Sequence, residues 1–192
     1  MCIGDKSEAV VSMLAASSIG AIWTSCSPDF GVQGVLDRFG QVEPKIFICV
    51  DSYFYNGKTF NCLEKNENII SKLPSIQRTL LVRYVDDKAS FDNLNSFSTF
   101  DEIVNQELTP ELNFESVGFN EPLYILFSSG TTGVPKCIVH GVGGTLIQHK
   151  KEHTLHCNIK SGERVFFFST CGWMMWNWLV SSLASGATLM LY

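Results

Sequence analysis

The segment LYILFSSGTTGVPK, residues 123–136, gives the clearest indication of the fold. It opens with a continuous apolar run, which predicts a buried strand, and it continues into glycines and hydroxyl side chains, which predict a loop. A loop that leaves the carboxyl end of a strand lies where ligands bind in open α/β sheets. We therefore expect an α/β fold with a binding site at this strand end.

The loop has the chemistry of a polyphosphate site. Gly130 and Gly133 permit backbone conformations that turn N–H groups into one concavity, and Lys136 adds a positive charge. Four hydroxyl side chains add further donors: Ser128, Ser129, Thr131 and Thr132. The Walker A pattern needs lysine directly after its second glycine. Here Val134 and Pro135 intervene, so this is a different phosphate loop. A flexible Ser/Gly turn is the alternative, and the Pro-Lys ending disfavours it.

The rest of the chain alternates apolar runs with helical patterns. We expect strands at 21–26, 46–50, 79–85, 123–129, 165–169 and 187–192, and helices at 7–19, 32–39, 59–72, 99–106, 142–157 and 173–184. Ser7 is expected to cap the first helix, and Gly20 and Gly40 to end the first two. Such repeats favour a largely parallel sheet with flanking helices. The polar segment 86–118 is expected to be a surface excursion.

The composition bounds the class of protein. Hydrophobic residues make up 45% of the chain and charged residues 17%, which favours one domain with a sizeable core and a partly covered surface. A net charge of −5 without a basic stripe argues against nucleic acid as a partner. Seven cysteines without a C-x-x-C pair favour reduced thiols in the cytosol over disulfides or zinc. The start of the chain does not have the pattern of a signal peptide.

The final 28 residues, 165–192, carry no charge. That length could cross a bilayer. Glycine and serine interrupt the stretch, however, so we expect a strand, a helix and a second strand instead of a membrane span. The chain opens almost directly on a helical pattern and closes on an apolar run, so we expect both ends to be cuts in a longer chain.

The segment SSGTTGVPK resembles the phosphate loop of the adenylate-forming superfamily, which includes acyl-CoA synthetases. The resemblance implies ATP bound with Mg²⁺, an acyl-adenylate intermediate and transfer to a thiol. It implies that the phosphates are bound by Ser128, Ser129, Gly130, Thr131, Thr132, Gly133 and Lys136, with Thr132 and Lys136 catalytic. These groups would neutralise charge on the leaving pyrophosphate.

Two further segments, 20–51 and 171–192, are similar to the branch of this superfamily that activates acetoacetate. The implied reaction joins acetoacetate to CoA at the expense of ATP and returns ketone-body carbon to lipid synthesis in the cytosol. The family's later signatures, including its ribose and Mg²⁺ ligands, are absent before Tyr192. The resemblance therefore implies that 1–192 is part of the N-terminal domain, without the C-terminal domain, and inactive by itself.

The same resemblance implies that Trp173, Met174 and Met175 line the acyl pocket, although such clusters are also ordinary core residues. We expect the nearby Asn177 to satisfy buried backbone groups, with a bond to the substrate ketone as the alternative.

A second implied site binds CoA. Tyr55 and Lys58 occupy the loop that offers basic side chains to CoA phosphates in related enzymes, and the turn at 27–29 (Ser27, Pro28, Asp29) corresponds to the family segment near the CoA adenine. A solvated lysine is the alternative for Lys58.

Three histidines, His149, His153 and His156, follow a helical spacing beside Cys157. Because charged residues surround them and no further ligand is suggested, we expect solvated side chains and no metal site. His140 is expected to pack beneath the phosphate loop, with a place in the active site as the alternative.

Three other functions stay open at this point. The chain could be an inert or interaction-only product. It could also be a ligase for another short acid. A phosphotransferase would need an acidic Mg²⁺ ligand near a strand end, for which Asp51 is the obvious candidate.

Overall fold

The computed structural model describes the chain except residues 2–5, 87, 92–96, 107–110 and 129–132. The chain divides into two compact units. The first contains 1–4, 26–111 and 127–137, and the second contains 5–25, 112–126 and 138–192. Each unit combines helices with strands, as the sequence predicts.

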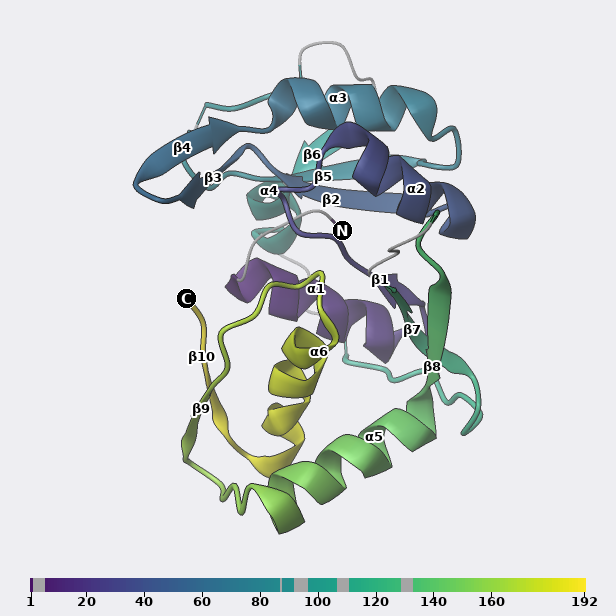
Figure 1. Ribbon diagram of the computed structural model, residues 1–192, viewed down its shortest axis with the longest axis vertical. Helices are drawn as coiled ribbons and strands as arrows, with labels where there is room; N and C mark the ends of the chain where they lie inside the picture. Colours follow the sequence, from purple (N-terminus) through teal and green to yellow (C-terminus); the bar gives the residue numbers. More distant parts are fainter. Residues whose placement is uncertain (2–5, 87, 92–96, 107–110, 129–132) are drawn as a thin grey trace. The chain divides into compact units, whose positions relative to one another are not determined.

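The first unit is built on a three-stranded parallel sheet in the order β2-β5-β6 (Figure 1). Its strands are β2 (Ile46–Val50), β5 (Arg78–Val82) and β6 (Phe97–Thr99), and Ile46 pairs in register with Arg78. The helices α2 (Val32–Val42) and α3 (Leu63–Lys72) pack against each other. The core between the helices and the sheet is apolar, and its buried members include Val35, Phe39, Phe47, Cys49, Ile69 and Leu81.

A β-hairpin interrupts the segment in which the sequence predicts the start of a helix. β3 (Ser52–Tyr55) pairs antiparallel with β4 (Lys58–Asn61). The connecting residues Asn56 and Gly57 have φ angles of 49° and 72°, the positive values that a two-residue type I′ turn requires. The expected helix at 59–72 therefore begins only at Leu63. The Asn-Gly pair was the available signal for this hairpin.

The second unit contains the sheet β1-β7-β8. Its strands are β1 (Trp23–Thr24), β7 (Pro122–Phe127) and β8 (Cys137–Gly141), and β1 runs parallel to β7. Two end residues, Phe127 and Cys137, cluster with the first unit. The helices are α1 (Ser7–Ser18), α5 (Val142–Lys151), which continues into a π-helical turn (Glu152–His156), and α6 (Met174–Ser181). A short helix, α4 (Phe100–Val104), lies in the first unit.

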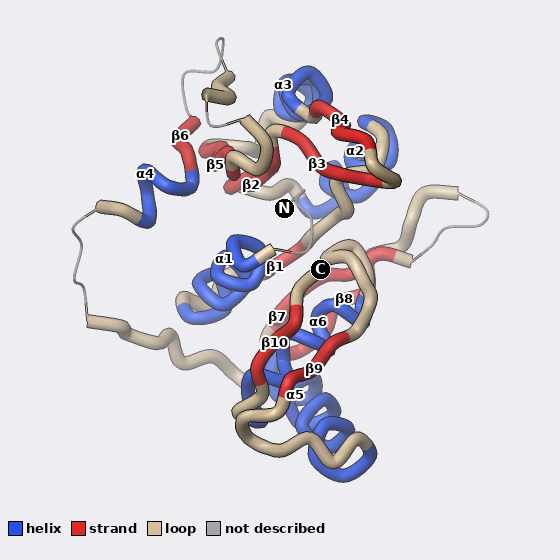
Figure 2. The backbone as a smooth tube through the Cα atoms, turned by 90° about the vertical axis from the view of Figure 1, so that its left-hand side faces the viewer, coloured by secondary structure: helices blue, strands red, loops and turns tan. Residues whose placement is uncertain are grey.

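The uncharged final stretch divides as expected. β9 (Arg164–Phe166) and β10 (Thr188–Met190) form a parallel pair that Figure 2 shows side by side, and α6 and a 3₁₀ turn (Ser182–Ser185) come between them in the chain. The strand expected at 165–169 ends at Phe166, and Phe166 and Phe168 are exposed. Within the part of the chain that the structure describes, no helix is long and apolar enough to cross a membrane.

Several helix and strand ends differ from the expected ones. Ser7 is the first residue of α1 and Lys6 holds the cap position, without a side-chain cap bond. Gly40 lies inside α2, which continues for two residues and ends at Glu43 in a left-handed conformation. Packing of Val42 against the core extends this helix past its glycine. β1 is shorter than expected, and β6 and β8 were not expected at all.

Candidate functional site

Two hydrogen bonds close the base of the predicted phosphate loop. The backbone N–H of Ser128 donates to the carbonyl oxygen of Lys136 at 3.0 Å, and the N–H of Lys136 donates to Ser128 Oγ at 2.9 Å. Gly133 has φ = 141°, a conformation that side-chain-bearing residues rarely adopt. The Lys136 side chain is exposed. The other predicted phosphate ligands (Ser129, Gly130, Thr131 and Thr132) lie outside the described residues.

The predicted CoA-binding residues lie opposite each other at the tip of the β3–β4 hairpin. Tyr55 pairs with Lys58 in register. Both are exposed, Tyr55 by 70%. The hairpin therefore brings a phenol and an ammonium group together at one exposed turn.

The turn at 27–29 is tied to the helix that follows this hairpin. Lys65 Nζ donates to the carbonyl oxygen of Pro28 and lies 5.8 Å from the ring centroid of Tyr53. Ser27 and Pro28 are buried and Asp29 is exposed. Burial raises the pKa of the neighbouring Cys62 thiol, and Lys65 opposes that shift.

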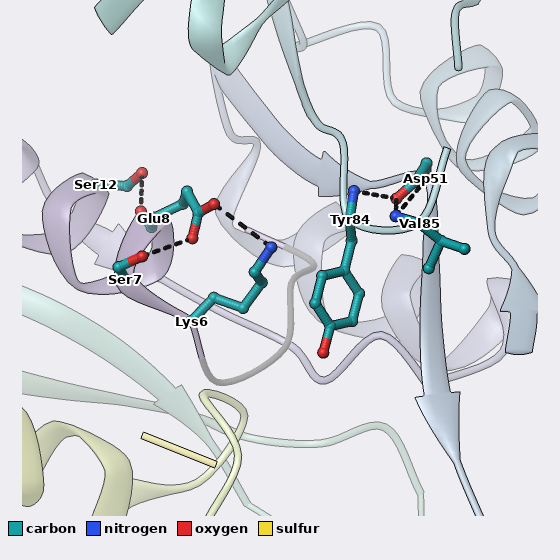
Figure 3. A network of polar contacts seen from close by, with 7 residues as sticks. All are labelled: Lys6, Ser7, Glu8, Ser12, Asp51, Tyr84 and Val85. Carbon is teal, nitrogen blue, oxygen red and sulfur yellow. Dashed lines mark hydrogen bonds and ion pairs between the residues drawn. The ribbon is translucent and has the colours of Figure 1, made fainter. Parts of the chain in front are cut away.

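Asp51 is fully buried, and its carboxylate accepts three backbone N–H groups that follow β5. The N–H of Tyr84 donates at 2.6 Å, that of Val85 at 3.0 Å and that of Asp86 at 2.7 Å. Figure 3 shows the carboxylate facing Tyr84 and Val85. The hypothesis of a phosphotransferase with Asp51 as its Mg²⁺ ligand is therefore wrong, because this carboxylate is committed to holding the loop after β5.

A groove of about 430 Å³ lies between α5 and α6 in the second unit. Its walls combine aliphatic, aromatic and polar groups: Val139, His140, Gly141, Gly144, Thr145, Gln148, His149, Glu152, Met174 and Trp178. Of the three residues predicted for the acyl pocket, Met174 lines this groove, whereas Trp173 and Met175 do not belong to its lining. Trp178 was missed, although its spacing of four residues from Met174 places both on one helix face.

A polar network fixes one side of the groove. Trp178 Nε1 donates to Glu152 Oε2 at 2.9 Å, and Gln148 Nε2 donates to Glu152 Oε1 at 2.5 Å.

Asn177 is fully buried, and its Nδ2 donates to the carbonyl oxygen of Trp173 at 3.4 Å, so it bonds a backbone group as expected. His140 lies 4.9 Å from the Tyr124 ring.

The expectation of solvated histidines is wrong for His149 and His153, which are both buried. His149 Nδ1 lies 2.8 Å from Ser181 Oγ, and the His153 ring meets that of Trp178 at 4.5 Å. Burial lowers the pKa of both imidazoles. His156 is exposed. Among the described residues, no group of three His, Cys, Asp or Glu side chains could hold a metal ion.

Burial shifts the pKa of a phenol in the opposite direction, because its charged form is the deprotonated one. It raises the pKa of the Tyr124 phenol to about 12. None of the six cysteines that the structure describes forms a disulfide (Cys26, Cys49, Cys62, Cys137, Cys157 and Cys171).

The family model described as AMP-binding enzyme matches residues 2–192, and the chain belongs to this family. Acetoacetyl-coenzyme A synthetase of Rhizobium meliloti (strain 1021) is 53% identical over 191 residues, which cover 96% of this chain and 28% of the relative. Malonamoyl-CoA synthetase of Penicillium aethiopicum is 47% identical over 196 residues, or 99% of this chain and 27% of the relative.

The structure of acetoacetyl-CoA synthetase from Streptomyces lividans matches the whole chain with a TM-score of 0.93 and 39% identity, over 29% of that protein. The chain thus spans less than a third of the length of each of these relatives. The structural match confirms the predicted α/β fold, and the family match confirms the resemblance of the chain to adenylate-forming enzymes.

Proposed function

We propose that this chain serves the ATP-dependent ligation of acetoacetate to CoA, an acid–thiol ligase reaction. The observation that carries the proposal is the phosphate loop, whose base is closed by Ser128 and Lys136 in a chain 53% identical to an acetoacetyl-coenzyme A synthetase. A carboxylate oxygen of acetoacetate attacks the α-phosphorus of ATP. The bond between that phosphorus and the oxygen that bridges to the β-phosphate breaks, and pyrophosphate leaves. The CoA sulfur then attacks the acyl carbon, and AMP leaves.

In the first step, the Lys136 ammonium offsets the charge that grows on the leaving pyrophosphate, and the Thr132 hydroxyl donates a hydrogen bond to it. The phosphates are held by the loop residues Ser128 to Gly133. Mg²⁺ accompanies ATP in this proposal. Among the described residues, no group of three His, Cys, Asp or Glu side chains could hold a metal ion, so no residue of that part of the chain is proposed as a Mg²⁺ ligand.

The acyl group binds in a pocket lined by Trp173, Met174 and Met175. The groove beside Met174 supports this assignment. A short 3-oxo acid needs both a small apolar wall and a polar partner for its ketone. Met174 and Trp178 offer the wall, and Thr145 and Gln148 offer donors. Another short acid with a carbonyl at the same position is the second candidate, and the 47% identity to a malonamoyl-CoA synthetase favours keeping it.

CoA contacts the hairpin tip at Tyr55 and Lys58, where the ammonium group pairs with phosphate. The exposure of both side chains supports this role. The product would enter lipid synthesis in the cytosol and so return ketone-body carbon to use.

The test uses a hybrid enzyme in which this chain replaces the matching segment of the R. meliloti relative. We expect acetoacetate-dependent exchange of labelled pyrophosphate into ATP. Lys136→Ala or Thr132→Ala should slow that exchange by about 10²–10³-fold, while Lys72→Ala, an exposed lysine on α3, should not. A folded hybrid without exchange, or with exchange unaffected by Lys136→Ala, would leave the inert or interaction-only product as the better reading.

A further inference from the structure

One side chain of α2 holds the residues on both sides of Lys136. Gln41 Nε2 donates to the carbonyl oxygen of Pro135 at 2.8 Å, and Gln41 Oε1 accepts a weak hydrogen bond from Cys137 Sγ at 3.6 Å. The same Nε2 also donates to the carbonyl oxygen of Asp37, one turn back in the helix, at 2.6 Å. Both N–H groups and the oxygen of the amide are therefore engaged.

The backbone of Lys136 itself is engaged with Ser128 through its N–H and its carbonyl oxygen. Pro135 is buried and contributes no N–H, so its carbonyl oxygen is the only backbone polar group through which this residue can be held. The lysine thus lies between two flanking residues bonded to Gln41, and its own backbone is bonded across the loop base.

The same helix also contacts Phe127, the last residue of β7, from which the loop leaves. The Arg38 guanidinium carbon lies 5.9 Å from the ring centroid of Phe127, and the rings of Phe39 and Phe127 are 6.4 Å apart. Arg38 is held in turn by a 2.7 Å bond from Nη1 to the carbonyl oxygen of Gly34. Helix α2 therefore contacts residues on both sides of the loop, and all of these contacts lie within the first unit.

We propose that Gln41 is a positioning residue for Lys136 in the adenylation step. Only an amide supplies the donors for two carbonyl groups and the acceptor for a thiol from one planar group. A displacement of a catalytic group by about 1 Å can cost about 10²-fold in rate. Gln41 therefore acts on the rate through Lys136, without touching the substrate. This proposal rests on the function proposed above.

The first experiment does not depend on that function. Gln41→Met keeps the side-chain length and removes every hydrogen bond, and Gln33→Met is the matched control, since Gln33 lies on the same helix and its Nε2 donates only to Asp37 Oδ1 at 2.6 Å. In the 192-residue chain, hydrogen exchange at the amides of 136 and 137 should become at least about tenfold faster in Gln41→Met. Gln33→Met should leave it unchanged. Unaltered exchange in a folded Gln41→Met chain would overturn the proposal.

The second experiment uses pyrophosphate exchange in the hybrid enzyme. Gln41→Met should lower kcat by about 10–50-fold with little change in the KM for acetoacetate. In the Lys136→Ala background the same substitution should lower kcat by less than about twofold, because the group that it positions is gone. Additive losses in the double variant would show a general structural role and reject positioning of Lys136. An inactive parent hybrid would count against the proposed function alone, and the exchange of the amides would still decide on Gln41.

Discussion

The carboxylate of Asp51 accepts the backbone N–H of Tyr84 at 2.6 Å, and this bond joins the end of β2 to the chain leaving β5. With Val85 and Asp86 also donating, one buried side chain satisfies three consecutive amides. Buried N–H groups without a partner are costly, so Asp51 defines the path of the chain after the parallel pair.

We expect Asp51→Asn to lower the free energy of unfolding by about 1–3 kcal/mol, since the amide keeps one acceptor oxygen but directs an NH₂ group at a backbone donor. Urea unfolding of the chain would measure the change. Asp29→Asn, at an exposed position in the same unit, serves as the control and should change stability by less than about 0.5 kcal/mol. Equal stability of the two variants would contradict the role given to Asp51.

The sequence predicted the elements whose signals are local. β2, β5 and β7 lie where continuous apolar runs indicated them, and α3 ends at Lys72 as expected. The phosphate loop could be found because its residue types sit next to one another in the chain. The hydrophobic pattern of these segments is sufficient to predict an open α/β fold.

The missed features depend on partners far away in the sequence. Nothing around Gln41 indicates its bonds to Pro135 and Cys137, which lie 94 and 96 residues later. The prediction of solvated side chains at His149 and His153 rests on the charged residues that follow His149. The four-residue spacing of the two histidines nevertheless places them on one helix face, and only the packing of α5 against α6 shows that this face is buried.

The two buried histidines should make folding depend on pH. Burial lowers the pKa of both, and Glu152 partly opposes this for each, while His140 adds to it at His149. The unfolded chain therefore binds protons more readily than the folded one below the ordinary histidine pKa of about 6.5. Their stabilising contribution is complete above that pH and is lost as the pH falls below it.

We therefore expect a lower urea midpoint at pH 5.5 than at pH 7.5, and a smaller difference in His153→Leu. His156→Gln, which replaces an exposed histidine, should retain the full difference. A pH dependence that is the same in His153→Leu and the parent chain would show that other groups cause it.

The groove between α5 and α6 makes a prediction about acid selectivity. In the hybrid enzyme, Met174→Ala should enlarge the wall beside Trp178 and shift preference toward longer 3-oxo acids by about 10–200-fold per added methylene. The measurement is the ratio of kcat/KM for 3-oxohexanoate and acetoacetate. Met190→Ala, on β10 outside this groove, should leave the ratio unchanged. An unchanged ratio in Met174→Ala would return Met174 to an ordinary packing role.

Two adjacent glycines in the first turn of α5 should respond to alanine in opposite ways. A Cβ built on Gly143 would lie 2.1 Å from the ring of Phe119, whereas one on Gly144 meets nothing within 4 Å. Neither has a positive φ, so steric space and helix propensity decide the outcome. Gly144→Ala should raise the free energy of unfolding by up to about 1 kcal/mol through helix propensity. Gly143→Ala should lower it by about 1–3 kcal/mol because the Phe119 ring must move.

Urea unfolding of both variants measures the difference in the free energy of unfolding. The double variant Gly143→Ala/Phe119→Ala should recover part of the loss that the clash causes. A stabilised Gly143→Ala chain would show that the Phe119 ring swings away without cost.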